Sequence, residues 1–124
     1  MVVPVVAEFP FDKTKRLLKA ADFKPVFDNA QFKISSKGLL FLSKHNRINN
    51  PRLGLVIAKK NIRLAVQRNR LKRIIRESFR LNQANIPNLD IVVLARKGLD
   101  AMDNSELQQH VAKLWQQLQH KASS

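Results

Sequence analysis

The segment RLGLVIAKKNIRLAVQRNRLKRIIRESFR, residues 52–80, joins a predicted strand to the most basic stretch of the chain. Branched apolar residues at its start are typical of a strand, and apolar residues then recur at helical spacing over residues 64–83. At 100° per residue, one helical side collects Leu64, Leu71, Ile74, Ile75, Ser78 and Phe79, and the other collects Asn69, Lys72, Arg73, Arg76 and Arg80. A strand followed by an amphipathic helix indicates a fold in which helices cover a sheet.

The residues before this segment predict one helix and two strands. In KAADFKPVFDNA, Asp22 can cap a short helix that places Phe23 and Phe27 one turn apart on the same face. In QFKISSKGLLFLSKHN, strand patterns flank a break near Gly38. The strand that begins residues 52–80 is therefore the third.

The residues after it predict one strand and one helix. DIVVLARKG has the continuous apolar character of a strand buried inside a sheet. Asp103, with Glu106 three residues later, resembles a capping box. The helix that follows has an apolar stripe of Leu107, Val111, Leu114, Trp115 and Leu118. The order helix, three strands, helix, strand, helix predicts an α+β or α/β domain with helices packed over one sheet.

Composition narrows the class of protein. The chain has 124 residues, enough for one domain, and 23 Lys plus Arg against 9 Asp plus Glu, a net charge of +14. Such an excess opposes compaction unless a polyanion neutralises it. Cysteine is absent from the sequence, which excludes disulfides and thiolate zinc sites. Without an apolar run of membrane-spanning length, we expect a soluble, cytoplasmic chain.

The residues that usually perform catalysis in a protein do not form a convincing set. The three glycines make no phosphate-cradling loop. The histidines stand far apart in polar contexts that suit the surface: His45, His110 and His120. An Mg²⁺ site could be imagined at Asp90, Asp100 and Asp103, but a strand start and a helix cap explain two of these better. We expect no catalytic residue and no metal site.

The basic helix instead indicates a polyanion ligand. Like charges three and four residues apart destabilise an isolated helix by a few tenths of a kcal/mol per pair. Residues 59–80 carry nine Lys or Arg and one acid, Glu77, so the signs do not alternate as on an ordinary solvated face. Charge alone does not separate DNA from RNA. Phe23, Phe27 and Phe41 could stack on unpaired bases, although periodicity alone favours ordinary core packing for them.

The same segment closely resembles the signature of the bacterial ribonuclease P protein family, whose hallmark is Arg-Asn-Arg, here Arg68, Asn69 and Arg70. KRLLKAADFKPVF is similar to the first helix of that family, DIVVLARKG to its last strand, and LWQQL lies in a matching terminal helix. The resemblance implies an α+β fold of order αβββαβα: a two-layer sandwich with a four-stranded mixed sheet and a left-handed βαβ crossover, similar to a ribosomal-protein domain. It divides the chain into an extended or flexible arm (1–12), one domain (13–119) and a flexible tail (120–124).

The resemblance also implies a function. In this family a large RNA with bound Mg²⁺ removes the 5′ leader of precursor tRNA, and the protein is the accessory subunit of that endoribonuclease, expected at one protein per RNA. Carried over to this sequence, the contacts to the catalytic RNA fall on Lys59, Lys60, Arg63, Arg68, Asn69, Arg70, Lys72, Arg73, Arg76 and Arg80. The contacts to the single-stranded leader fall on Arg16, Phe23, Phe27, Lys37 and Phe41. For Asn69, a structural role and a direct RNA contact remain equal alternatives.

Three other functions share some of these features. A ribosomal protein that holds RNA without serving a reaction would have a similar charge and fold, and only the Arg-Asn-Arg segment with its flanks separates the two. A DNA-binding regulator would prefer specific DNA over RNA at physiological salt. A nuclease acting alone would cleave RNA with metal in the absence of an RNA subunit.

Overall fold

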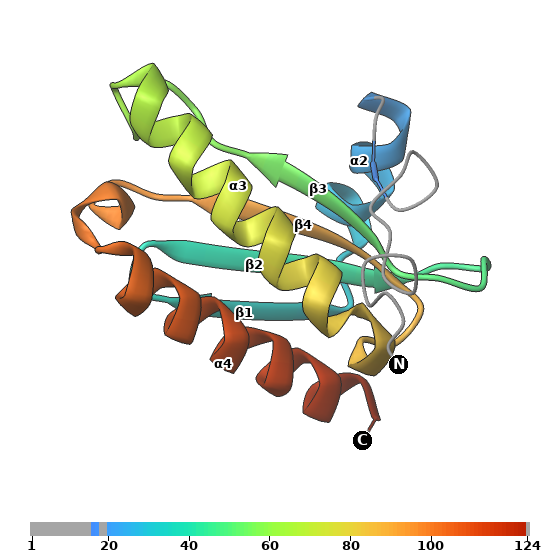
Figure 1. The fold of residues 1–124 in the computed structure, drawn as a ribbon. Coiled ribbons are helices and arrows are strands. Elements are labelled where there is room, and N and C mark those ends of the chain that lie inside the picture. The colour runs from blue at the N-terminus through green and yellow to red at the C-terminus, as the bar shows by residue number, and fades with distance from the viewer. Residues whose placement is uncertain (1–15, 18–19, 124) are drawn as a thin grey trace.

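The computed structural model describes residues 16, 17 and 20–123. Its elements follow in the order α2 (Ala20–Asn29), β1 (Phe32–Ser36), β2 (Leu39–His45), β3 (Arg52–Val56), α3 (Ala65–Asn82), β4 (Leu89–Ala95) and α4 (Asn104–Ser123). Two short 3₁₀ turns, Gln83–Asn85 and Leu99–Ala101, precede β4 and α4. The predicted order of helices and strands is confirmed (Figure 1).

The four strands form one mixed sheet in the order β1-β2-β4-β3. β2 pairs antiparallel with both β1 and β4, whereas β3 pairs parallel with β4 at the edge of the sheet. A parallel pair requires a crossover connection, and α3 supplies it. Because α3 crosses the front of the sheet in Figure 1, the β3-α3-β4 crossover is left-handed, the rare hand for such connections. The α+β class with a four-stranded mixed sheet is confirmed.

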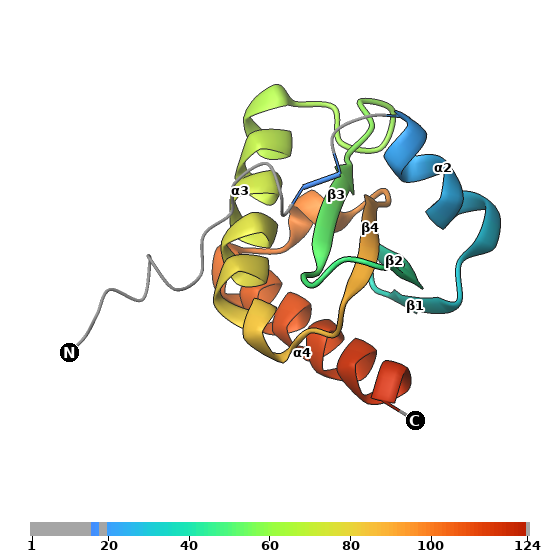
Figure 2. The ribbon, with the colours of Figure 1, turned by 90° about the vertical axis from the view of Figure 1, so that its right-hand side faces the viewer.

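Helices cover both faces of the sheet. α3 and α4 lie on one face and the shorter α2 lies on the other (Figure 2), so α2 adds a third layer to the expected two. The main core between the sheet and α3–α4 includes Phe41, Phe79 and Trp115, all at most 2 % exposed. A smaller cluster of Leu17, Val26, Leu42 and Val92 packs α2 against the opposite face. The sheet therefore presents two separate apolar surfaces.

The predicted cap and apolar stripe of α4 are confirmed. Asp103 Oδ1 accepts a hydrogen bond from the Glu106 N–H at 2.8 Å, and every residue of the stripe is buried. The helix continues to Ser123, so residues 120–123 extend α4 where a flexible tail was expected. His120 and Lys121 in its last turn suit the negative end of the helix dipole.

At the other end of the chain, α2 differs from its prediction. Asp22 lies inside the first turn of α2 and not at the position before the helix, and its carboxylate is 4.0 Å from the guanidinium of Arg52 on β3. The proposed arm, residues 1–12, lies outside the described residues. No helix in the described part of the chain is long and apolar enough to cross a membrane.

Candidate nucleic-acid interface

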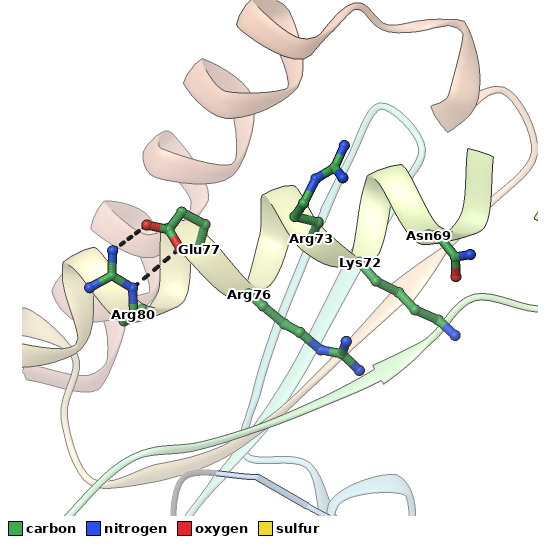
Figure 3. A pocket seen from close by; sticks show the side chains of 6 residues that line it. All are labelled: Asn69, Lys72, Arg73, Arg76, Glu77 and Arg80. Atoms are coloured by element: carbon green, nitrogen blue, oxygen red, sulfur yellow. Dashed lines mark hydrogen bonds and ion pairs between the residues drawn. The ribbon is translucent and has the colours of Figure 1, made fainter. Parts of the chain in front are cut away.

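The polar face of α3 forms an open basic groove. α3 buries Leu71, Ile74, Ile75 and Phe79 against the sheet and α4, which turns the opposite face outward. The groove has a volume of about 400 Å³ and is lined by Asn69, Lys72, Arg73, Arg76, Glu77 and Arg80 (Figure 3). The sequence therefore predicted correctly which side chains lie together on this face. Here we call it the α3 groove.

One cation of the α3 groove is already paired. The Arg80 guanidinium donates two hydrogen bonds to the Glu77 carboxylate, with Nε at 3.2 Å from Oε2. These bonds lower the pKa of Glu77 and raise that of Arg80. Lys72, Arg73 and Arg76 have no ion pair within the described part of the chain. The groove thus presents three unpaired cations and the Asn69 amide.

The two arginines of the Arg-Asn-Arg motif do not point into the α3 groove. Arg68 Nη1 donates to the backbone oxygens of Ile62 and Arg63 at 2.8 and 2.9 Å. Arg70 donates to the side chain of Asn104, at the start of α4, at 2.7 Å. Both side chains are half-buried, whereas Asn69 between them is exposed and lines the groove.

The other predicted RNA contacts lie in the loop before α3. Lys59, Lys60 and Arg63 are exposed there, and the Asn61 amide ties the loop to the end of β4 by donating to the Ala95 oxygen at 3.0 Å. The bond brings this loop next to Arg96 and Lys97, two further exposed cations that follow β4 and that the predicted contact set omitted. In the sequence, the position of this basic pair directly after a buried strand could have indicated both residues as RNA contacts.

On the opposite face of the sheet, α2 forms an apolar groove. It has a volume of about 600 Å³ and is lined by Phe23, Lys24, Phe27, Asp28 and Val56. The two phenylalanine rings stack with centroids 6.4 Å apart, and Phe27 is 45 % exposed. Lys24 donates to Asp28 at 2.8 Å, which raises the pKa of Lys24. An exposed aromatic pair in an apolar groove offers a stacking surface for a flat ligand.

A small groove across the edge strand β3 connects the other two. It has a volume of about 160 Å³, and its lining includes Arg16, Phe23, Gly54, Lys72 and Arg76. Lys72 and Arg76 also line the α3 groove, and Phe23 also lines the apolar groove. In Figure 3 both Lys72 and Arg76 extend from α3 toward β3. The three grooves therefore form one continuous surface from the basic helix, across β3, to the stacked rings.

Residue 54, where this surface crosses β3, has no room for a side chain. A Cβ atom at residue 54 would lie 2.5 Å from Cε1 of the Phe23 ring and 3.1 Å from Cβ of Leu17. We predict that Gly54→Ala displaces the Phe23 ring and weakens binding of a single-stranded RNA about 10-fold, because base stacking contributes roughly 1–3 kcal/mol per base. Fluorescence anisotropy with a labelled oligonucleotide would measure the loss. An unchanged affinity would show that the position of the Phe23 ring is unimportant.

Two of the predicted leader contacts lie elsewhere. Phe41 is fully buried in the main core, with its ring centroid 4.9 Å from that of Trp115, so the structure contradicts its placement beside Phe23 and Phe27. Successive residues of a strand face opposite sides of the sheet, and it is the neighbouring Leu42 that packs toward α2. Lys37, in the turn between β1 and β2, lines a separate groove along α4.

Two of the three acids that might have held a metal, Asp90 and Asp103, have structural partners. Asp90 accepts two hydrogen bonds from Arg52, at 2.8 and 2.7 Å, and one from Asn46 at 3.0 Å. The bonds to Asp90 raise the pKa of Arg52 and hold the start of β3 beside β4. The described residues contain no group of three or more His, Cys, Asp or Glu side chains placed to hold a metal.

Comparison with known proteins identifies the family of this chain. The sequence model of the Ribonuclease P family matches residues 11–119. The ribonuclease P protein components of Pseudomonas putida and Pseudomonas aeruginosa are each 56 % identical over 108 residues, which is 87 % of this chain and 81 % and 80 % of those proteins.

Solved structures agree as well. The RNase P protein of Staphylococcus aureus superposes with a TM-score of 0.74 at 32 % identity, covering 82 % of this chain and 95 % of that one. The RNase P protein of Thermotoga maritima gives a TM-score of 0.72 at 32 % identity, covering 82 % and 96 %. The chain therefore belongs to the ribonuclease P protein family, and it is the accessory protein of an endoribonuclease that processes the 5′ end of tRNA together with an RNA subunit.

Proposed function

We propose that the α3 groove binds the catalytic RNA of ribonuclease P and that the apolar groove on α2 binds the single-stranded leader of precursor tRNA. The observation that carries this proposal is the continuity of the three grooves. The connecting groove shares Lys72 and Arg76 with the α3 groove and Phe23 with the apolar groove. The α3 groove is basic, and the apolar groove is aromatic. They lie on opposite sides of the edge strand β3, so one protein could hold both RNAs at once.

The charge of the α3 groove suits a folded RNA. Lys72, Arg73 and Arg76 can neutralise phosphates and release condensed counterions, which favours binding most strongly at low salt. The planar guanidinium of arginine also binds two phosphate oxygens at once. We propose that the protein supplies no catalytic group, that Mg²⁺ is bound through the RNA subunit, and that the added positive charge lowers the Mg²⁺ concentration which the complex requires.

The apolar groove suits an unpaired strand. The rings of Phe23 and Phe27 can stack on bases of any sequence, because every base has a π face. Arg16 and Lys72, in the connecting groove, are placed to contact the phosphates of a strand that runs from the rings toward α3. We propose one protein per RNA subunit, acting in the cytoplasm.

Cleavage of a 5′-labelled precursor tRNA at low Mg²⁺ tests this function. Three samples are compared: the protein, a bacterial ribonuclease P RNA, and the two combined. Cleavage at the mature 5′ end in the combined sample alone is the expected result, and activity should saturate at one protein per RNA in a titration. Cleavage by protein free of RNA would identify a nuclease acting alone. An inactive combination would favour a binding protein of the ribosomal class.

A further inference from the structure

The Arg70 side chain spans two elements that are distant in the sequence. Its Nε donates to Gln67 Oε1 at 2.8 Å, and its Nη1 donates to Asn104 Oδ1 at 2.7 Å. Its Nη2 donates to the backbone oxygens of Asp100 and Met102, both at 3.1 Å. Three of these four hydrogen bonds therefore fasten the second turn of α3 to the connection between β4 and α4 and to the first residue of α4.

Arg68 fastens the same end of α3 to the loop before it. Nη1 of Arg68 donates to the backbone oxygens of Ile62 and Arg63, and Ile62 is fully buried. The N-cap residue of α3, Leu64, makes no side-chain capping bond, so the helix start lacks the usual local support. Arg68 instead ties the loop that carries Lys59 and Lys60 to the helix, by donating to two carbonyl oxygens of that loop.

We propose that Arg68 and Arg70 are positioning residues, and that Asn69 is the member of the Arg-Asn-Arg motif that faces the RNA. This inference rests on the proposed binding of RNA in the α3 groove. The two arginines set the direction of α3 relative to the loop and to α4, and so align Asn69, Lys72 and Arg76 along the groove. Arg70 contacts no phosphate in the complex.

The geometry favours this role over direct contact. A guanidinium has five N–H donors, and Arg70 already uses four of them. Turning the guanidinium toward a phosphate would take this donor away from the half-buried backbone oxygens of Asp100 and Met102. Arg73 carries the same charge, is exposed, and makes no hydrogen bond or ion pair within the described part of the chain.

The salt dependence of binding separates the two roles. Affinity for ribonuclease P RNA is measured across a series of salt concentrations for the unchanged protein, Arg70→Gln and Arg73→Gln. Losing a phosphate contact reduces the slope of log K against log salt by about 0.7 to 0.9. We expect this reduction for Arg73→Gln. For Arg70→Gln we expect an affinity loss of about 10-fold, a lower melting temperature and an unchanged slope. A slope reduced by Arg70→Gln would overturn the inference.

Three further variants keep the test decisive if Arg70→Gln folds poorly. Arg70→Lys keeps the charge and loses the planar set of donors, so we expect it to bind as weakly as Arg70→Gln. Arg73→Lys still neutralises a phosphate, so it should keep the salt slope of the unchanged protein. Asn104→Ala removes one anchor and no charge, so we expect weaker binding at an unchanged slope. If Arg70 were a phosphate ligand, Asn104→Ala would release it, and equal or tighter binding would contradict the positioning role.

The same experiment distinguishes failure of the inference from failure of the proposed function. Should Arg73→Gln leave both affinity and slope unchanged, the α3 groove does not bind this RNA, and the proposed function fails with the inference that rests on it. Should Arg73→Gln and Arg70→Gln both reduce the slope, the proposed function stands and only the positioning role is wrong.

Discussion

Replacing Lys72, Arg73 and Arg76 together by glutamine is expected to weaken binding to ribonuclease P RNA by about 100-fold at roughly 0.1 M salt, because three phosphate contacts and their counterion release are lost. The slope of log K against log salt should fall by about 2 to 3. The protein should stay folded, since none of the three side chains is buried or ion-paired within the described part of the chain. Filter binding or anisotropy over a salt series measures both quantities.

A matched triple variant distinguishes the effect of the α3 groove on RNA affinity from the effect of net charge alone. Lys33, Lys113 and Lys121 are exposed on β1 and α4, outside the three connected grooves. Replacing these three by glutamine removes the same charge, and we expect the RNA affinity to fall by less than about 5-fold through the weaker long-range field. Equal losses in the two triple variants would contradict a specific role for the α3 groove.

The second large effect is the loss of stability or of leader binding when a phenylalanine on one or the other face of the sheet is replaced by alanine. Phe41→Ala should lower the free energy of unfolding by about 3–5 kcal/mol, because it leaves a cavity beside Trp115 in the main core. Phe27→Ala should cost much less stability, since that side chain is 45 % exposed. It should instead weaken leader binding by roughly 1–3 kcal/mol per stacked base.

Chemical denaturation and RNA binding together test this separation. Binding is measured for a precursor tRNA and for the same tRNA without its leader, in complex with the RNA subunit. Phe27→Ala should reduce the difference between the two substrates, and the affinity for the leaderless tRNA should stay unchanged. A stable Phe41→Ala protein that loses the leader effect would show that Phe41, contrary to its burial, acts in leader binding.

Sequence pattern was a reliable guide wherever one face of an element is buried. The apolar positions of α3 and α4 follow from period alone, because burial of apolar surface dominates their free energy. The same period correctly placed Lys72, Arg73 and Arg76 on one exposed face. It did not place Phe41, since its leader role was inferred by resemblance, and a shift of one residue in a strand exchanges the two faces of the sheet.

The roles of the arginines required the tertiary structure. Arg68, Arg70 and Arg73 are equivalent in composition and local pattern, yet one holds a loop, one holds the start of α4 and one is exposed. The acceptors for Arg70 are some 30 residues away in the chain, so no local pattern could reveal them. The continuity of the three grooves likewise depends on α2, β3 and α3 meeting at Gly54.

By itself, the sequence determined the class of fold, the helix that carries the charge and the need for a polyanion. Hydrophobic periodicity and net charge can both be obtained from the sequence without knowledge of long-range contacts. Only the tertiary structure decided which cations are available to that polyanion and which hold the protein together. The N–H donors of Arg70 are occupied because backbone oxygens of Asp100 and Met102 lie about 3 Å away. Only the tertiary fold brings these oxygens, distant in the sequence, to the guanidinium.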